Sequence, residues 1–189
     1  MLADTAVEAR EAARDIGYPV ALKTAAGHSH KWDVGGVHLG LTTASEVDGA
    51  YADLSARLGP AVLVSGMAPA GVEIGLGAVL DDAFGPIVVV SAGGVLIELL
   101  EDKNVALAPF GPDEARDLLG EIKVHKLLAG VRGSPPSDMQ ALAELISRFS
   151  VMVAALAPEL AEVDVNPVIA GAWGALAVDA LVVTKQRKA

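Results

Sequence analysis

Three polar side chains near the C-terminal end of the chain have the spacing of a metal site. Glu162, Asp164 and Asn166 stand two residues apart, so a β-strand points all three to one face. Amide and carboxylate oxygens are ligands that Mg²⁺ accepts, with waters or phosphate oxygens at its remaining positions. A solvent-facing strand with polar residues on its wet side is the alternative interpretation.

The turn that follows brings a fourth oxygen ligand into register. If the hairpin closes over 171–174, with Ala170 opposite Ala175, then Asn166 falls opposite Asp179. Directly opposed side chains lie about 4.5–5.5 Å apart at Cβ, close enough to share one cation. The hairpin therefore predicts a Mg²⁺ site, although a register slip of one residue would remove it.

The stretch SHKWDVGGVHLG, residues 29–40, places His30 and Asp33 beside a pair of glycines. A polar turn between two strands is one interpretation, and a loop that handles phosphate is the other. His28 suggests a metal-binding pair, but no third ligand stands near it. Neutral imidazole attacks phosphorus well and titrates near pH 7, so His30 is also a candidate nucleophile.

Three further charged residues and one glycine pair fit either a phosphate site or an ordinary structural position. Lys23 ends the apolar strand VALK, where it can serve as a point charge for phosphate. Glu98 lies among aliphatic residues in GGVLIELL, so it is either at a solvated strand end or paired with a cation. Arg132, between glycines, suits phosphate or carboxylate, or is a plain loop arginine. Gly93 and Gly94 would let the backbone approach a phosphate, although a glycine pair alone is a weak signal.

Composition limits the class of protein. The chain has 189 residues, of which 52% are hydrophobic and 20% charged, so it is long and apolar enough to fold around a core. It has no cysteine, which excludes disulfides and thiolate metal sites. The net charge of −10 argues against a nucleic-acid partner, but a few placed cations and a divalent metal can still serve a nucleotide.

Neither a secretory signal nor a membrane-spanning segment is expected. Residues 1–17 read as an amphipathic helix, and the most apolar run, 85–100, carries two central glycines and is too short to span a bilayer. We therefore expect a cytoplasmic protein with no membrane partner.

The elements that must position these residues come in alternating groups. Periodicity and caps predict helices over 4–16, 45–58 with Ser45 as cap, 112–122, and 139–156 with Ser137 or Asp138 as cap. Strands are predicted over 20–24, 36–41, 61–67, 71–81, 85–93, 95–100, 105–110 and in the last hairpin. This pattern is typical of a mixed α/β or α+β fold with much antiparallel sheet.

In this order and spacing, the chain resembles the ATP-grasp domain of NDP-forming acyl-CoA synthetases. This is the family of ADP-forming acetate–CoA ligase and is related to succinyl-CoA synthetase. Four stretches carry the resemblance, residues 17–41, 71–110, 127–138 and 161–183. It implies an ATP-grasp fold of largely antiparallel sheets flanked by helices, with the N-terminal part of the fold missing.

The resemblance also implies a domain organisation. Residues 1–189 would form a single ATP-grasp domain, with a nucleotide-binding lobe over about 1–67, a metal- and phosphate-binding lobe over about 68–184, and a tail at 185–189. The CoA-binding and ligase parts would be other domains or a partner subunit.

The implied reaction is reversible: acyl-CoA, ADP and phosphate give the acid, CoA and ATP, through an acyl phosphate and a phosphohistidine. The ligands implied for this domain are ATP or ADP and Mg²⁺, whereas CoA would bind to the other domains. Phosphoryl transfer needs mainly positioning and charge neutralisation, which suits cations, Mg²⁺ and glycines.

Residue roles follow by matching the family's motifs. His30 would carry the phosphoryl group, with Asp33 beside it and Arg132 near the phosphoryl path. Lys23 would contact the phosphates, Glu73 the ribose hydroxyls, and Glu98 the metal–phosphate zone. The complete nucleotide-binding set is Lys23, Val64, Met67, Glu73, Gly93, Gly94 and Glu98, in which the backbone of the strand with Val64 and Met67 frames the adenine. The metal set is Asn166, Asp179 and Asp164.

Two positions depart from the family pattern. Trp32 stands where members usually carry a small residue, and Ser65–Gly66 where they carry Gln-Glu. These departures keep open a non-catalytic module that binds nucleotide or partners CoA-binding domains. A carboxylate–amine ligase of the ATP-grasp type is a third interpretation, against which the His30 loop counts. Apolar surface left by the missing part would favour a homodimer.

Overall fold

The computed structural model describes residues 1–26, 34–94, 97, 101–131 and 133–185. These residues form two compact units, Met1–Met67 and Ala68–Ala189. Each unit has its own sheet and its own hydrophobic core.

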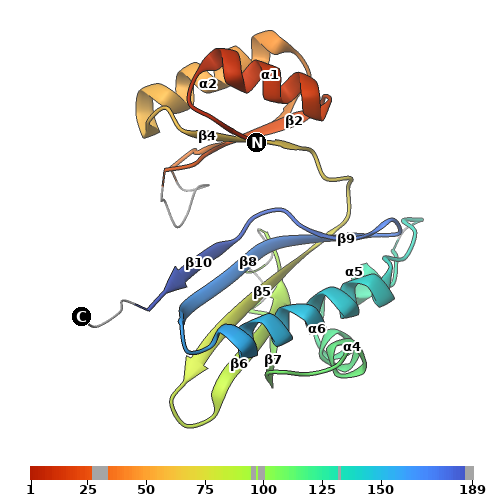
Figure 1. Ribbon diagram of the computed structural model, residues 1–189. Helices are drawn as coiled ribbons and strands as arrows, with labels where there is room; N and C mark the ends of the chain where they lie inside the picture. Colours follow the sequence, from red (N-terminus) through yellow and green to blue (C-terminus); the bar gives the residue numbers. More distant parts are fainter. Residues whose placement is uncertain (27–33, 95–96, 98–100, 132, 186–189) are drawn as a thin grey trace. The chain divides into compact units, whose positions relative to one another are not determined.

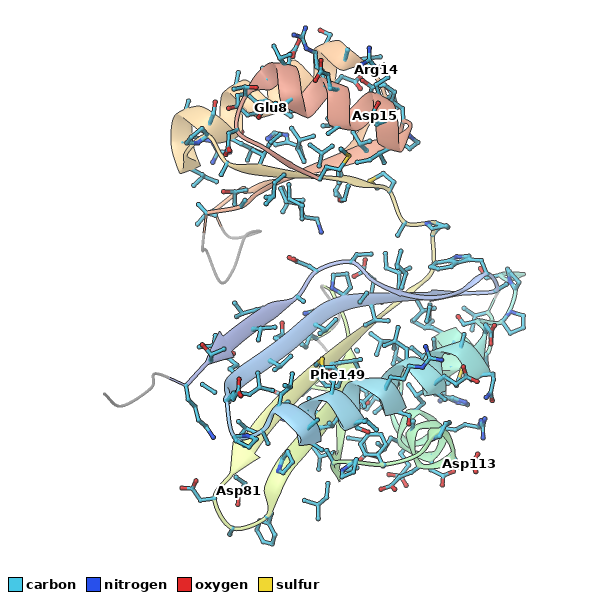
Figure 2. All side chains as sticks on the ribbon, viewed as in Figure 1. Glu8, Arg14, Asp15, Asp81, Asp113 and Phe149 are labelled. Carbon is cyan, nitrogen blue, oxygen red and sulfur yellow. The ribbon has the colours of Figure 1, made fainter. Side chains whose placement is uncertain are left out.

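The first unit is a four-stranded sheet with two helices on one face (Figure 1). Its elements in chain order are β1 (Leu2–Ala3), α1 (Ala6–Ile16), β2 (Val20–Thr24), β3 (Val37–Leu41), α2 (Ala44–Leu58) and β4 (Val62–Gly66). The strand order is β1-β4-β2-β3, so β4 and β2 are central. Val20 and Leu22 of β2 pack with Val47 and Leu54 of α2, which makes the helix-covered face of the sheet apolar. The charged residues Glu8, Arg14 and Asp15 of α1 are exposed (Figure 2).

Local capping chemistry sets the ends of these helices. Gly17, with φ 89°, ends α1 as the sequence predicts. Thr43 begins α2 with a capping box, because its Oγ1 accepts a hydrogen bond from Glu46 N–H at 3.2 Å and Glu46 accepts one from Thr43 N–H. The cap predicted at Ser45 is therefore wrong: Thr43, not Ser45, has a glutamate three residues later.

The second unit is a six-stranded sheet whose helices cover one face (Figure 1). Its elements are β5 (Val72–Asp81), β6 (Gly85–Ala92), β7 (Lys103–Leu107), α4 (Pro112–Glu121), α5 (His125–Leu128), α6 (Met139–Leu156), β8 (Leu160–Gly171), β9 (Gly174–Ala177) and β10 (Leu181–Thr184). The strand order is β10-β8-β5-β6-β7, and β9 also pairs with β8. Strand β5 is therefore flanked by β8 and β6.

Helix α6 supplies much of the core of the second unit. Asp138 caps it by accepting a hydrogen bond from Ala141 N–H at 2.9 Å. Leu142 and Ile146 are fully buried, and Phe149 lies on α6 in the layer between helix and sheet (Figure 2). Within the described residues, α6 alone is long and apolar enough to cross a membrane by length and composition. Its buried side, 39% of the helix, packs in the core of the second unit.

The predicted α/β class with largely antiparallel sheets is confirmed, and every strand pair among the described residues is antiparallel. Three strand predictions are wrong in detail. The strand expected over 105–110 is β7, which begins at Lys103 and ends at Leu107. The last strand is interrupted at 178–180 and divides into β9 and β10. In the range 95–100, Ile97 lies in a helical turn instead of a strand, and the other five positions lie outside the described residues.

Candidate functional site

The sheet of the second unit has one face without helices, and β5 brings predicted site positions to it. Ile74 and Leu76 belong to the core under the helices, so Glu73, Gly75 and Gly77 point to the opposite face. Gly75 is itself buried, because a Cβ there would lie 2.7 Å from Ser91 Oγ and 3.8 Å from Ile97 Cδ1, whereas Gly77 is half-buried. Glycine in a strand interior is found where a ligand or another backbone approaches closely.

The turn after β6 packs directly on β5 at Glu73. Gly93 N–H donates a hydrogen bond to Glu73 O at 2.9 Å. A Cβ on Gly93 would lie 2.7 Å from backbone atoms of Ile74, and a Cβ on Gly94, where φ is 55°, would overlap Oε2 of Glu73. Backbone packing therefore requires glycine at position 93, whereas at position 94 glycine is favoured by the positive φ and leaves room for the Glu73 carboxylate.

Asn166 reaches the same turn from β8, the other neighbour of β5. Its Oδ1 accepts a hydrogen bond from Gly94 N–H at 3.2 Å. The structure thus brings together four residues that the sequence predicted separately, namely Glu73, Gly93, Gly94 and Asn166. We call these four residues the glycine-turn cluster.

A bulge in β8 places Asn166 at this turn. Ile74 pairs with Val168 and Leu76 pairs with Val165, so Asn166 and Pro167 together oppose the single residue between them on β5. Bulges redirect side chains and recur next to functional sites, and they also accommodate a proline that has no N–H to donate. The bulge thus places the side chain of Asn166 where its Oδ1 can accept the hydrogen bond from Gly94 N–H.

The register predicted for the last hairpin is confirmed where its ladders form. Ala170 pairs with Ala175, and Asp164 pairs with Leu181. Equal numbers of residues separate these pairs on the two strands, so Asn166 and Asp179 stand at opposed positions in the interruption between β9 and β10. Both side chains are half-buried, and Asp179 Oδ1 accepts a hydrogen bond from Ala180 N–H at 3.0 Å.

This donor set fits Mg²⁺ better than it fits a transition metal. An amide oxygen has two lone pairs, so Asn166 Oδ1 can accept from Gly94 and also bind a cation. Mg²⁺ in proteins commonly takes one or two carboxylates and fills its other positions with water or phosphate. Across the described parts of the chain, no group of three or more His, Asp or Glu side chains could hold a metal ion. The metal role of Asn166, Asp179 and Asp164 stays a prediction.

Lys23 lies in β2, one of the two central strands of the first unit's sheet. Leu22 belongs to the core under the helices, so Lys23 points to the helix-free face. Its cross-strand neighbours are Val37 of β3 and Leu63 of β4, and only 8% of the residue is exposed. Its stem is therefore flanked on both sides, and its phosphate role stays a prediction.

The predicted adenine-framing strand is β4, and its backbone is partly engaged. Val64 N–H donates to Met1 O at 2.8 Å, and Val64 O accepts from the Met1 amine at 2.6 Å, while the side chain is fully buried. The backbone N–H and C=O of Val64 are therefore both engaged by Met1 in this structure, and the adenine-framing role of Val64 stays a prediction. Met67 is more open, although its N–H donates to Pro19 O at 3.2 Å.

Sequence reasoning missed an ionic network in the first unit. Asp53 accepts a hydrogen bond from Arg57 Nε at 2.9 Å and lies 2.9 Å from His38 Nε2. Arg57 also donates to Val34 O and Gly35 O, each at 2.9 Å. Hydrogen bonds from Arg57 and then His38 hold the pKa of Asp53 well below its usual range. The spacing of Asp53 and Arg57 on one helix face was the available signal.

Four predicted residues, His30, Asp33, Glu98 and Arg132, lie outside the described residues.

The fold defines the class of protein. Two antiparallel sheets, each with helices on one face, make up an ATP-grasp fold, and the profile of the ATP-grasp domain family matches residues 1–184. The chain belongs to this family.

Named relatives place the chain within that family. The 4-hydroxybutyrate–CoA ligase (ADP-forming) of Nitrosopumilus maritimus is 39% identical over 177 residues, covering 89% of this chain and 25% of the relative. The beta subunit of acetate–CoA ligase (ADP-forming) I of Pyrococcus furiosus is 34% identical over 182 residues, covering 92% of this chain and 78% of the subunit. The chain therefore spans about a quarter of the first relative's length.

Solved structures agree with these relatives. Acetyl-coenzyme A synthetase 1 of Candidatus Korarchaeum cryptofilum, in complex with coenzyme A and Ca-AMPCP, matches with TM-score 0.90 and 36% identity, over 98% of this chain and 84% of that chain. A second structure of that protein, with TM-score 0.84, 36% identity and the same coverage, holds Mg-AMPPCP and has its phosphohistidine segment pointing towards the nucleotide-binding site. The present chain is an ATP-grasp domain of the kind found in NDP-forming acyl-CoA synthetases.

Proposed function

We propose that this chain binds ATP or ADP with Mg²⁺ and passes a phosphoryl group between His30 and ADP, as the nucleotide-binding part of an ADP-forming acyl-CoA synthetase. The glycine-turn cluster carries the proposal, because it unites a carboxylate and an amide oxygen at one turn on the helix-free side of the sheet. The Korarchaeum structure with Mg-AMPPCP supports it by likeness.

The nucleotide contacts are assigned by the chemistry of each group. Glu73 is exposed on β5 and its carboxylate can accept hydrogen bonds from ribose hydroxyls. Lys23 supplies a fixed positive charge for phosphate oxygens. Gly93 and Gly94 would contribute by holding the turn and the Glu73 carboxylate in place, and Met67, directly after β4, keeps its predicted contact with the adenine.

Asn166 and Asp179, with Asp164, would hold Mg²⁺ through one amide oxygen and carboxylate oxygens. When bound, Mg²⁺ neutralises phosphate charge during transfer. The half-buried positions of all three side chains keep their oxygens within reach of solvent and ligand.

The phosphoryl step uses His30 as nucleophile. One ring nitrogen attacks the γ-phosphorus of ATP with its lone pair, the bond from phosphorus to the bridging oxygen breaks, and ADP leaves with that electron pair. The proton on the other ring nitrogen passes to solvent. In reverse, a terminal oxygen of ADP attacks the phosphorus of the phosphohistidine and regenerates ATP. In both directions Arg132 and Lys23 would offset the negative charge of the phosphate oxygens, and Asp33 would lie beside the imidazole.

Partner domains or a partner subunit would supply the CoA site and the acyl chemistry. Two relatives support this assignment, since one is a subunit named beta and the other is a ligase four times longer than the matched segment.

Calorimetry tests the nucleotide and metal assignments. The chain is titrated with ADP and with ATP, with and without Mg²⁺. We expect Mg²⁺-dependent binding that Asn166→Ala plus Asp179→Ala weakens at least tenfold. Glu162→Ala is the matched control, because Glu162 lies on the same face of β8 two residues before Asp164. Unchanged binding in the double variant would overturn the metal assignment.

Labelling tests the phosphoryl step. Incubation with γ-labelled ATP and Mg²⁺ should give acid-labile, base-stable label that His30→Ala abolishes. His28→Ala, two residues before His30, should keep the label. Absence of label on the unsubstituted chain, even with CoA-binding domains added in trans, would overturn the catalytic part and leave a nucleotide-binding module.

A further inference from the structure

We propose that the aliphatic part of the helix-free face of the second unit binds a second copy of this chain. Five side chains form this surface, namely Val79 of β5, Ile87 and Val89 of β6, and Val105 and Leu107 of β7. We call these five residues the aliphatic patch. The inference goes beyond the proposed function, because none of the five is assigned to the nucleotide, to Mg²⁺ or to the phosphoryl group.

The strand registers set the side chains of the aliphatic patch next to one another. Val79 pairs with Ile87, which pairs with Leu107, and Val89 pairs with Val105. Core residues alternate with them along the three strands, so the patch points to the helix-free face of the sheet. Val79 stands six residues along β5 from Glu73, about 20 Å at about 3.3 Å per residue, so the patch is separate from the glycine-turn cluster.

The aliphatic patch is exposed as well as contiguous. Val79, Val105 and Leu107 are 55%, 53% and 54% exposed. Phe84, in the turn between β5 and β6 that Asp81 marks in Figure 2, is 70% exposed and adds apolar surface at the same end of the sheet. Single exposed apolar residues are common on soluble proteins, whereas contiguous ones mark interaction surfaces. The patch therefore has the composition of a contact between proteins.

The edge of β7 is less suited to a partner than its face. β7 is the last strand on its side of the sheet. Asp102 O and Ala108 N–H bond towards β6, so the odd-numbered residues of β7 direct their N–H groups to the edge. Val105 N–H, one of these groups, already donates to Asn104 Oδ1 at 2.8 Å. A strand added along this edge would have to displace that hydrogen bond, which leaves the sheet face as the contact surface.

Charges on the two flanks of the aliphatic patch complement each other across a symmetric contact. Glu162 and Asp164 lie on the helix-free face of β8, on the β5 side of the patch, and Lys103 lies on the same face at its β7 side. Lys103 has no ion-pair partner among the described residues. In a two-fold symmetric contact the same surface serves both copies, so the cation of each copy can face the acids of the other. A partner with a wholly basic or wholly acidic rim would match only one flank, which favours a second copy as the occupant.

The net charge of the chain sets the condition under which this contact is measured. A charge of −10 opposes the approach of two copies at long range. At about 0.15 M salt the Debye length is about 8 Å, so distant charges are largely screened while charges at the contact still interact. The two sheet faces can then pack as the halves of a β-sandwich do, about 10 Å apart with their side chains interdigitated.

Sedimentation equilibrium of the full chain at about 0.15 M salt measures the dissociation constant of the dimer. We expect Val105→Thr plus Leu107→Thr to raise that constant at least tenfold, because a symmetric contact loses each apolar surface twice. Val182→Thr is the matched control, since Val182 is 55% exposed on β10, the opposite edge strand, and pairs with the core residue Val163, so it faces away from the patch. The urea midpoint of the patch variant should equal that of the control, because all three substitutions are at exposed positions.

Charge reversal tests the pairing of the two flanks. Lys103→Glu should weaken the dimer, because it sets an acid of each copy against the acids of the other. Adding Glu162→Lys to Lys103→Glu should give a tighter dimer than Lys103→Glu alone. A double variant that is no tighter than Lys103→Glu refutes the contact between the flanks.

The remaining outcomes bear on the aliphatic patch itself. A chain that is monomeric at every concentration overturns the proposal and leaves the patch to another occupant, such as the CoA-binding part of the enzyme. A dimer that Val105→Thr plus Leu107→Thr leaves unchanged, or that Val182→Thr weakens equally, places the contact elsewhere and also overturns it. Neither result touches the proposed function, because nucleotide binding and phosphoryl labelling do not enter this measurement.

Discussion

The variants Gly93→Ala and Gly94→Ala should distinguish the contribution of the glycine turn to stability from its contribution to nucleotide binding. At Gly93 the new Cβ would lie 2.7 Å from the backbone N and C of Ile74 and 2.8 Å from the backbone C of Glu73. Backbone atoms in a strand cannot rotate out of the way as a side chain can, so the turn that contains Gly93 must shift away from β5. Overpacking costs about 1–3 kcal/mol, and loss of the bond from Gly93 N–H to Glu73 O adds about 0.5–1.5 kcal/mol. We expect Gly93→Ala to lose about 2–4 kcal/mol.

At Gly94 the obstacle is softer. The added Cβ would meet the carboxylate end of Glu73, which can rotate away, and the remaining cost is that of φ 55° for a non-glycine residue, about 1–2 kcal/mol. Gly94→Ala should therefore be the more stable of the two variants. It should also weaken nucleotide binding as much as Glu73→Ala does, because the carboxylate has moved.

Thermal unfolding followed by circular dichroism measures the first effect. Each kcal/mol lowers Tm by about 4 °C for a unit of this size, so Gly93→Ala should fall by about 8–16 °C and Gly94→Ala by about 4–8 °C. Gly120→Ala in α4 is the control, since nothing lies within 4 Å of its added Cβ and alanine favours helix. A Tm for Gly93→Ala equal to that of the unsubstituted chain, or one above Gly94→Ala, would refute this reasoning.

Two further predictions concern the first unit. Thr43→Ala should cost about 1 kcal/mol in urea unfolding through loss of the α2 cap, whereas Ser45→Ala should be neutral, and the reverse order would contradict the capping box. The pKa of Asp53 is held below its ordinary value of 3.8, chiefly by Arg57 and then by His38, so its ionised form stabilises the folded state. That contribution is complete above about pH 5 and is lost as pH falls below 3.8 towards the folded pKa. The urea midpoint of the unsubstituted chain should therefore exceed that of Asp53→Asn at pH 7, and the difference between the two midpoints should shrink below pH 4. A difference that stays constant from pH 7 to pH 2 would contradict this prediction.

Rules that depend only on neighbouring residues were enough to predict most helices and strands and the pairing register of the last hairpin. The apolar spacing of α6 and its cap at Asp138 could be read from neighbouring residues. The pairing of Ala170 with Ala175 followed from a glycine turn flanked by alternating residues. Such features depend on interactions within one helix or one hairpin, so no distant contact is needed to find them.

Features set by distant contacts were not predictable. The pairing of Met1 with Val64 joins residues 63 positions apart and engages the backbone N–H and C=O of Val64. Arg57 and Asp53 stood at a recognisable helical spacing, but the carbonyls that Arg57 binds are 22 and 23 residues away. The sequence alone offered no means of choosing those acceptors.

The bulge at Asn166 and Pro167 adds a residue that the core itself does not require. Val163 and Val165 before it and Val168 and Ala170 after it all face the helices, and a strand one residue shorter would keep all four on that face. The core would thus accept either length. The extra residue instead lets both Asn166 and Pro167 lie opposite Gly75. The number of residues in this part of β8 is therefore set by the helix-free face of the sheet and not by the face that packs against the helices.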